Sequence, residues 1–255
     1  MNPDTESLLE AATRPYRSSG KYAWYFARGK LRHDPFFFWV LRSGLLPERG
    51  RLLDLGCGQG LLLALLTAAR RQYALGQWPQ GWPEPPSSFQ MHGIELDRGR
   101  ARTACRALGT GAEIDCCDIR YAPFPACSVV VMNGVLLYLD EAEQVRVLQK
   151  AVDALCPGGL LLLREADAGA GLRFQITQWS DRLIAANRGR FWRKLHYRAA
   201  PAWISSLEEM GLVVHVQPMR QGTPFSNILL IGRRGAFSSA EKPVNDTEKN
   251  PGFPP

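Results

Sequence analysis

The chain has 255 residues, a hydrophobic fraction of 45% and a formal net charge of +7, which favour one domain with appendages and a sizeable core. No apolar run approaches the ~20 residues of a membrane-spanning helix, and residues 1–20 are too polar for a secretory signal. The six cysteines lack C-x-x-C pairs. We therefore expect small buried thiols, a cytoplasmic protein and no metal site.

The predicted elements alternate between strands and helices. Two N-terminal helices are expected at 22–32 and 36–43, separated by Asp34-Pro35. Further helices are expected at 59–71, 97–108, 141–155, 172–186 and 201–210. Strands are expected at 51–55, 91–96, 112–115, 127–133, 160–164, 212–216 and 228–232. This order predicts an α/β fold built on a mostly parallel sheet.

The same pass along the chain suggests its domain organisation. Residues 1–48 would form a helical cap or substrate lid, and residues 49–235 the ligand-binding domain. Residues 236–255 are rich in Ser, Pro, Asn and Lys, so we expect a disordered tail. Residues 76–90 form a Trp-, Gly- and Pro-rich loop, interpreted as a surface insertion in preference to a lid.

The charge is concentrated in two basic segments. Residues 14–42 hold seven Lys and Arg against Asp34 alone, and residues 173–198 hold seven against Asp181 alone, so each carries +6. Either these are solvated helix faces, or they attract an anionic substrate or an acidic partner. Both interpretations stay open at this point.

The most informative stretch lies between the first predicted strand and its helix, and reads Asp54-Leu55-Gly56-Cys57-Gly58-Gln59-Gly60. Glycines let backbone approach a ligand closely, and free N–H groups at a helix start favour an electronegative group. Such a turn after the first strand of a parallel sheet commonly binds a nucleotide. The G-x-G-x-G spacing differs from the G-x-G-x-x-G dinucleotide fingerprint, which disfavours a nicotinamide oxidoreductase.

This stretch resembles motif I of class I S-adenosylmethionine-dependent methyltransferases, and the resemblance extends over about residues 50–234. It implies a Rossmann-like, seven-stranded, mostly parallel sheet with an antiparallel last strand, and S-adenosylmethionine as cofactor. The cofactor-binding residues that it implies are Asp54, Gly56, Cys57, Gly58, Gly60, Glu95, Leu96, Asp118, Ile119 and Asn133.

The resemblance also assigns individual roles. Asp54 would face the cofactor's amino group, and Glu95 would accept both ribose hydroxyls. Asp118 would accept the adenine amino hydrogen, and Asn133 would lie beside the transferred methyl. Glu95 follows Gly56 later than the ~20 residues usual after such a turn, and the 76–90 insertion accounts for the excess.

Methyl transfer from a sulfonium needs positioning more than acid–base machinery. A phenolic acceptor would still benefit from a base, and the candidates are His33, His196 and the tyrosines Tyr22, Tyr25, Tyr138 and Tyr197. A given histidine is more often structural than catalytic. His92 and His215 fall in predicted strands and are expected in the core.

Two C-terminal segments, 171–174 and 222–227, are similar to a bacterial subgroup encoded with aryl polyene and related aromatic pigment biosynthesis, a form of secondary metabolism. This similarity implies a small aromatic acceptor, free or bound to an acidic acyl carrier protein that the basic segments would attract. Membrane and nucleic-acid partners are not expected. The alternatives are an RNA methyltransferase, suggested by the basic balance, and a non-catalytic subunit that only binds the cofactor.

Overall fold

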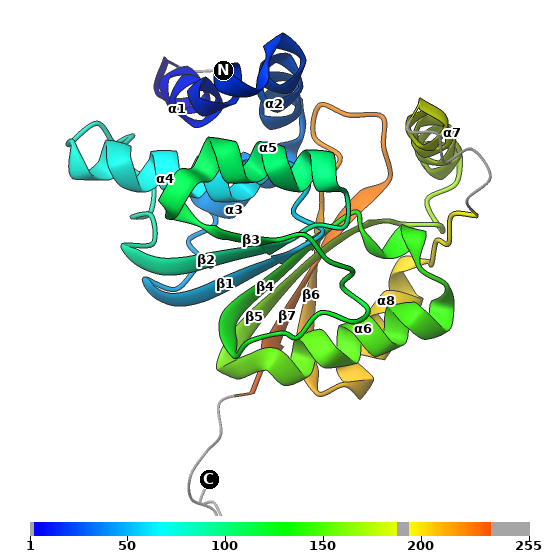
Figure 1. The fold of residues 1–255 in the computed structure, drawn as a ribbon. Helices are drawn as coiled ribbons and strands as arrows, with labels where there is room; N and C mark the ends of the chain where they lie inside the picture. Colours follow the sequence, from blue (N-terminus) through cyan, green and yellow to red (C-terminus); the bar gives the residue numbers. More distant parts are fainter. Residues whose placement is uncertain (1–2, 188–193, 236–255) are drawn as a thin grey trace, which may run out of the picture.

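The computed structural model describes residues 3–187 and 194–235 and contains a seven-stranded sheet between layers of helices (Figure 1). The strands are β1 (Arg49–Leu55), β2 (Ser88–Ile94), β3 (Glu113–Asp115), β4 (Cys127–Asn133), β5 (Leu155–Ala166), β6 (Leu212–Pro218) and β7 (Asn227–Arg234). Their order is β3-β2-β1-β4-β5-β7-β6. Strand β7 runs antiparallel to β5 and β6, whereas the other neighbours pair in parallel. The expected sheet is therefore confirmed.

Helices cover both faces of the sheet. Helices α4 (Leu61–Ala74) and α5 (Arg98–Leu108) lie on one face, and α6 (Glu141–Ala154) and α8 (Ala200–Glu209) lie on the other (Figure 1). Successive residues of β1 enter opposite cores: Leu52 packs in the α4 cluster, and Leu53 packs in the α6 cluster. Burial on both faces explains why the central strands are nearly continuous apolar runs.

The N-terminal segment forms an outer layer above α4 and α5, except for its last helix, which lies beside α4 and nearer the sheet (Figure 1). It comprises α1 (Pro3–Thr13), a 3-10 helix η1 (Arg14–Ser19), α2 (Lys21–His33) and α3 (Pro35–Arg42). Helix α1 was not predicted, because its composition is polar apart from a short apolar face. That face is fully buried, with Leu8 and Leu9 at 0% exposure in the α4 cluster. Two further 3-10 turns are η2 (Gly109–Gly111) and η3 (Leu136–Tyr138).

Local capping signals place several helix boundaries where the sequence predicts them. The Asp34 carboxylate accepts the Phe36 N–H at 3.1 Å and separates α2 from α3. At the start of α6, Asp140 and Glu143 form a reciprocal capping box. Helix α7 (Leu172–Asn187) also matches its predicted range and stands beyond the carboxyl ends of the strands (Figure 1).

Three sequence expectations need correction. Strand β5 begins at Leu155 rather than at 160, because Leu155 already pairs with Cys127 before the register shifts. His215 is exposed rather than in the core, since β6 is the edge strand of the sheet. Only Cys57 and Cys127 are buried thiols, whereas Cys105 and Cys116 are exposed. The predicted tail at 236–255 lies outside the described residues.

The 76–90 segment is largely a loop, although its last residues belong to β2. Trp82 makes edge contacts with Phe38 of α3 and with Trp78, and the Arg42 guanidinium lies over the Trp82 ring. The insertion is thus an aromatic packing element against the N-terminal layer. Within the described residues, no helix combines the length and apolar character needed to cross a membrane.

Candidate functional site

The glycine turn joins β1 to α4 at the carboxyl edge of the sheet. Gly56, Gly58 and Gly60 have backbone φ angles of 73°, 60° and 74°, which residues with a Cβ rarely adopt. A Cβ on Gly56 would lie 2.5 Å from Val135 Cγ2, whereas one on Gly58 would meet nothing within 4 Å. Gly56 is therefore fixed by packing, and Gly58 leaves open space beside the backbone.

Glu95 follows β2 and is 6% exposed. One of its carboxylate oxygens accepts the Gly58 N–H and the other accepts the Asp97 N–H, both at 2.8 Å. Each carboxylate oxygen has a second lone pair for a ligand. Glu95 thus fixes the glycine turn and lines the adjacent cavity.

Asp54, at the end of β1, is 4% exposed. Burial and the neighbouring Glu95 carboxylate raise the pKa of Asp54 to about 7. A buried carboxylate next to another is costly unless a cation joins them. The pair therefore suits a ligand that carries a positive charge.

Tyr16 reaches the same turn from the N-terminal layer. Its side chain is fully buried, and its hydroxyl donates to the Gln59 carbonyl at 2.8 Å. Burial raises the pKa of Tyr16, so the hydroxyl stays a donor. Sequence reasoning did not identify Tyr16, because nothing local indicates a contact 43 residues away.

One cavity of about 270 Å³ brings most of the predicted residues together. Its lining includes Asp54, Gly56, Cys57, Gly58, Glu95, Leu96, Asp118, Ile119, Asn133 and Tyr138. Gly60 lies just outside this lining, where it caps α4 and packs against Leu108. The volume is near the lower end of the ~300–1,000 Å³ typical of small-molecule sites.

Asp118 enters the cavity wall as part of an ion-pair network. Its carboxylate accepts from the Arg120 backbone and guanidinium, at distances of 2.7–3.1 Å. Arg120 also donates to Glu143 of α6 at 2.6 Å. This network fixes the orientation of Asp118 at the predicted adenine end.

The cavity lining also includes residues from β5, β7 and the N-terminal helices. Arg164 of β5 donates to Asn133 Oδ1 at 2.9 Å and contacts Asp34 at 3.2 Å. The next residue, Glu165, is 4% exposed and accepts the Leu136 N–H at 3.0 Å. Burial raises the pKa of Glu165 to about 8. Neither residue was identified from the sequence.

Aromatic and polar side chains complete the cavity lining. Phe26 of α2 and Phe36 and Phe37 of α3 line the cavity, as do Tyr197 and Asp181. The Tyr197 hydroxyl donates to Asp181 at 3.1 Å. Burial and the Asp181 charge raise the pKa of Tyr197. The insertion loop contributes none of the described lining residues, so a lid function for it has no support here.

The two candidate catalytic histidines lie elsewhere. His33 is exposed at the end of α2. His196 is half-buried, and its backbone donates to Leu137 and accepts from Gln144. Neither is among the described residues that line the cavity, in contrast to Tyr138. A catalytic role for either histidine remains a prediction without geometric support.

The fold and the glycine-turn site define a Rossmann-like domain of the methyltransferase type. A family model described as "Methyltransferase domain" matches residues 24–216. Because the match covers most of the chain, the protein belongs to this family, and its turn identifies it as a class I S-adenosylmethionine-dependent methyltransferase domain.

Similar curated proteins are carboxy-S-adenosyl-L-methionine synthases. The Haemophilus ducreyi protein is 28% identical over 131 residues, covering 49% of this chain and 48% of that protein. The Psychrobacter arcticus protein is 30% identical over 120 residues, covering 45% and 40%. The matched region thus spans about half the length of these relatives or less.

Several solved structures share the fold. Human N-acetylserotonin methyltransferase in complex with S-adenosylmethionine has a TM-score of 0.58 at 15% identity, over 89% of this chain and 59% of that one. The pyocyanin biosynthetic protein PhzM gives 0.59 at 16%, over 86% and 60%. The cyclase SpnF gives 0.56 at 18%, over 79% and 80%. Identities this low show the fold alone.

Proposed function

We propose that the protein transfers a methyl group from S-adenosylmethionine to a small aromatic acceptor, free or bound to a carrier protein. The observation that carries this proposal is one cavity whose lining combines the glycine turn, Asp54 and Glu95 with aromatic side chains. Cofactor and acceptor would then meet near Asn133, at the end of β4.

The described residues fit this cofactor. The open space beside Gly58 admits a ligand against backbone, and the second lone pairs of Glu95 suit a ribose diol. The Asp54–Glu95 pair gains a counter-charge from a cationic ligand. When bound, the cofactor supplies a methyl group already activated by its sulfonium charge.

The acceptor end suits a flat ring. Phe26 and Tyr197 are partly exposed and offer aromatic faces, and Asn133 is oriented by Arg164. A phenolic acceptor must lose a proton, and the lining carboxylate Asp181 is a group that accepts one. Exclusion of water by the buried walls strengthens these polar contacts.

The first test is calorimetric titration of the full chain with S-adenosylhomocysteine, with NADH in parallel. We expect micromolar binding of the former alone. Binding of NADH instead, or of neither compound to the folded protein, contradicts the assignment of the glycine turn.

The second test supplies labelled S-adenosylmethionine with three acceptor sets: small phenols, aromatic acyl groups on a carrier protein, and RNA. Label in either of the first two supports the proposal. Label in RNA supports the RNA methyltransferase alternative, and cofactor binding without turnover on any set supports a non-catalytic subunit.

A second candidate function is the formation of a carboxylated cofactor. It follows from the curated relatives, which are carboxy-S-adenosyl-L-methionine synthases. A carboxylated cofactor carries an extra anion near the transferring carbon. Arg164 stands beside Asn133 in the cavity, and its buried Nε finds no hydrogen-bond partner among the described residues. Mass spectrometry of the ligand that co-purifies with the protein distinguishes S-adenosylmethionine from its carboxylated form, because the carboxylated form is heavier by one carbon dioxide.

A further inference from the structure

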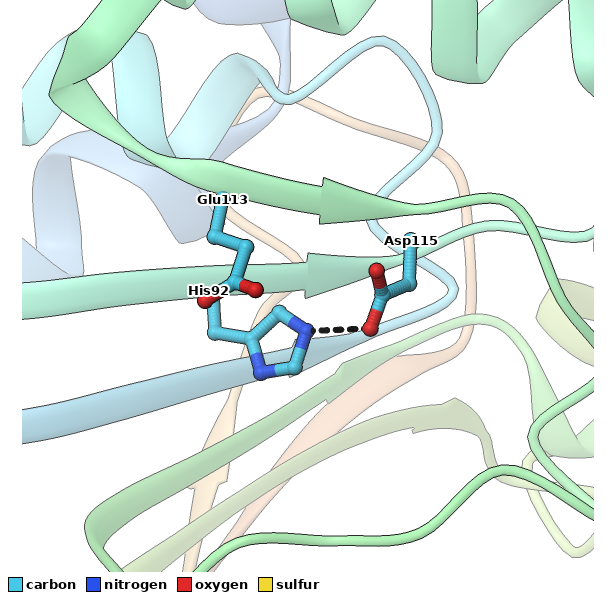
Figure 2. A group of neighbouring side chains, drawn as sticks. All are labelled: His92, Glu113 and Asp115. Atoms are coloured by element: carbon cyan, nitrogen blue, oxygen red, sulfur yellow. Dashed lines mark hydrogen bonds and ion pairs between the residues drawn. The ribbon is translucent and has the colours of Figure 1, made fainter.

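Away from the cavity, three potential metal ligands meet at the β2–β3 edge of the sheet (Figure 2). His92 pairs in register with Glu113, and Ile94 pairs with Asp115. Neighbours in register share a face, and so do residues two apart on one strand. The side chains of His92, Glu113 and Asp115 therefore lie on the same face.

The spacing of their ligand atoms is close to that of a metal site. One atom from each residue lies within 4.8 Å of the other two, and His92 Nε2 lies 2.9 Å from Asp115 Oδ2. Tetrahedral ligands at ~2.1 Å from a zinc ion lie about 3.4 Å apart. The His92 side chain is only 12% exposed and set on a central part of the strand, whereas Glu113 and Asp115 are exposed. The carboxylates can therefore close the remaining gap by rotamer changes.

We propose that His92, Glu113 and Asp115 bind one divalent transition-metal ion of the Zn²⁺ class. Imidazole favours zinc, nickel and copper, whereas magnesium and calcium prefer all-oxygen sites. Two carboxylates neutralise the ion's charge, and three protein ligands leave a position for water. The site does not depend on the proposed methyltransferase activity.

The ion would join an edge strand to its neighbour. Strand β3 has three residues and pairs only with β2 within the sheet. The chain after β3 continues to Asp118 in the cavity wall, and the chain after β2 continues to Glu95. An ion bound to the folded chain alone raises its stability by mass action, and here it would do so beside the cofactor cavity.

The experiment is calorimetric titration of the chelator-treated full chain with Zn²⁺ and, separately, with Mg²⁺. We expect one Zn²⁺ per chain with micromolar affinity, a raised melting temperature, and no Mg²⁺ binding. His92→Ala should weaken Zn²⁺ binding at least about tenfold. The matched control is His215→Ala, because His215 is exposed on the far edge strand β6 and should leave Zn²⁺ binding unchanged.

A second variant and a Co²⁺ absorption spectrum test the metal site even if His92→Ala destabilises the β2–β3 edge of the sheet. Glu113→Gln changes one exposed carboxylate, and it should also weaken Zn²⁺ binding several-fold. The exposed Cys116 thiol is a competing ligand. A thiolate charge-transfer band with Co²⁺, or loss of binding in Cys116→Ser, overturns the proposal. Unchanged affinity in both the His92 and Glu113 variants overturns it as well.

Discussion

Glu95 illustrates how one residue can serve both architecture and binding. Its two oxygens hold the backbone N–H groups of Gly58 and Asp97, while the carboxylate lines the cavity. The ribose role implied by family resemblance and the observed turn-holding role use different lone pairs, so they are compatible.

Glu95→Ala should weaken binding of S-adenosylhomocysteine at least about tenfold, equivalent to ~1.4 kcal/mol or more. Two ribose contacts are lost, and the Gly58 N–H loses its acceptor. Calorimetry measures the change, with circular dichroism as a check on folding. Glu48→Ala, at an exposed position just before β1 and therefore at the opposite end of that strand from the turn, is the control. Unchanged affinity in Glu95→Ala would remove Glu95 from the cofactor site.

The buried carboxyls predict a pH dependence of stability. The pKa of Glu165 is raised from 4.5 to about 8, and that of Asp54 from 3.8 to about 7. For a raised pKa, the unfolded state binds fewer protons between the two values, so stability falls as pH rises. We expect the ligand-free protein to lose stability from about pH 4.5 to pH 8.

Glu165→Gln tests this dependence, because glutamine keeps a carbonyl oxygen for the Leu136 N–H but does not titrate. Urea unfolding at several pH values should show a flatter profile in this variant than in the wild type. An identical slope would mean that Glu165 is not protonated in the folded protein. A cationic ligand beside Asp54 should reduce the wild-type slope too.

At the scale of elements, the sequence predicted the helix boundaries that are set by contacts within a few residues. The Asp140–Glu143 capping box and the Asp34-Pro35 break depend on contacts within a few residues, and both stand where the sequence places them. The glycine turn also follows from one short stretch. Helix α1 was missed because its few apolar residues are explained only by the surface of α4 that they cover.

The cavity residues of β5 and β7 were beyond sequence reasoning for the same reason. Arg164 and Asn227 belong to β5 and β7, which are neighbours only because the chain crosses over to insert β7 between β5 and β6. Likewise, His92 and Asp115 are 23 residues apart and meet through strand register. Contacts that depend on strand order leave no periodic trace in the sequence.

Asp34 should be the most sensitive residue joining α2 and α3 to the sheet. It is 6% exposed, caps α3, and pairs with Lys30 at 2.7 Å and Arg164 at 3.2 Å. Asp34→Ala removes the cap and leaves buried Arg164 without this partner, so we expect a loss of about 3–5 kcal/mol. Asp34→Asn keeps a capping oxygen and should cost about 1 kcal/mol less. Urea unfolding measures both, and equal losses would show that the cap contributes nothing.

At the scale of the whole molecule, residues 3–48 share the core of the rest of the chain. Leu8, Leu9, Tyr16, Leu31 and Phe36 are all at 0% exposure in the α4 cluster, beside Leu52 of β1. A lid that detaches from the domain would have to expose these buried side chains to water. The boundary near residue 48 is a change of layer within one packed unit.

Deletion of residues 1–48 should therefore prevent stable folding. Five fully buried side chains at ~1.5–3 kcal/mol each amount to on the order of 10 kcal/mol, comparable with the ~5–15 kcal/mol of a whole domain. The measurement is the yield and thermal transition of soluble protein, and deletion of 236–255 is the control for truncation itself. A cooperative transition in the 49–255 fragment would establish that the first 48 residues are a separate cap.

The Asp34–Arg164 pair has a consequence for engineering. It joins the N-terminal helices to the sheet beside Asn133, and Arg164 and Asn133 line the cavity proposed to hold the acceptor. An exchange of N-terminal segments with a related enzyme, made to alter acceptor choice, would separate these two charges if only one side were transferred. A chimera should therefore carry the residues at positions 34 and 164 from the same parent.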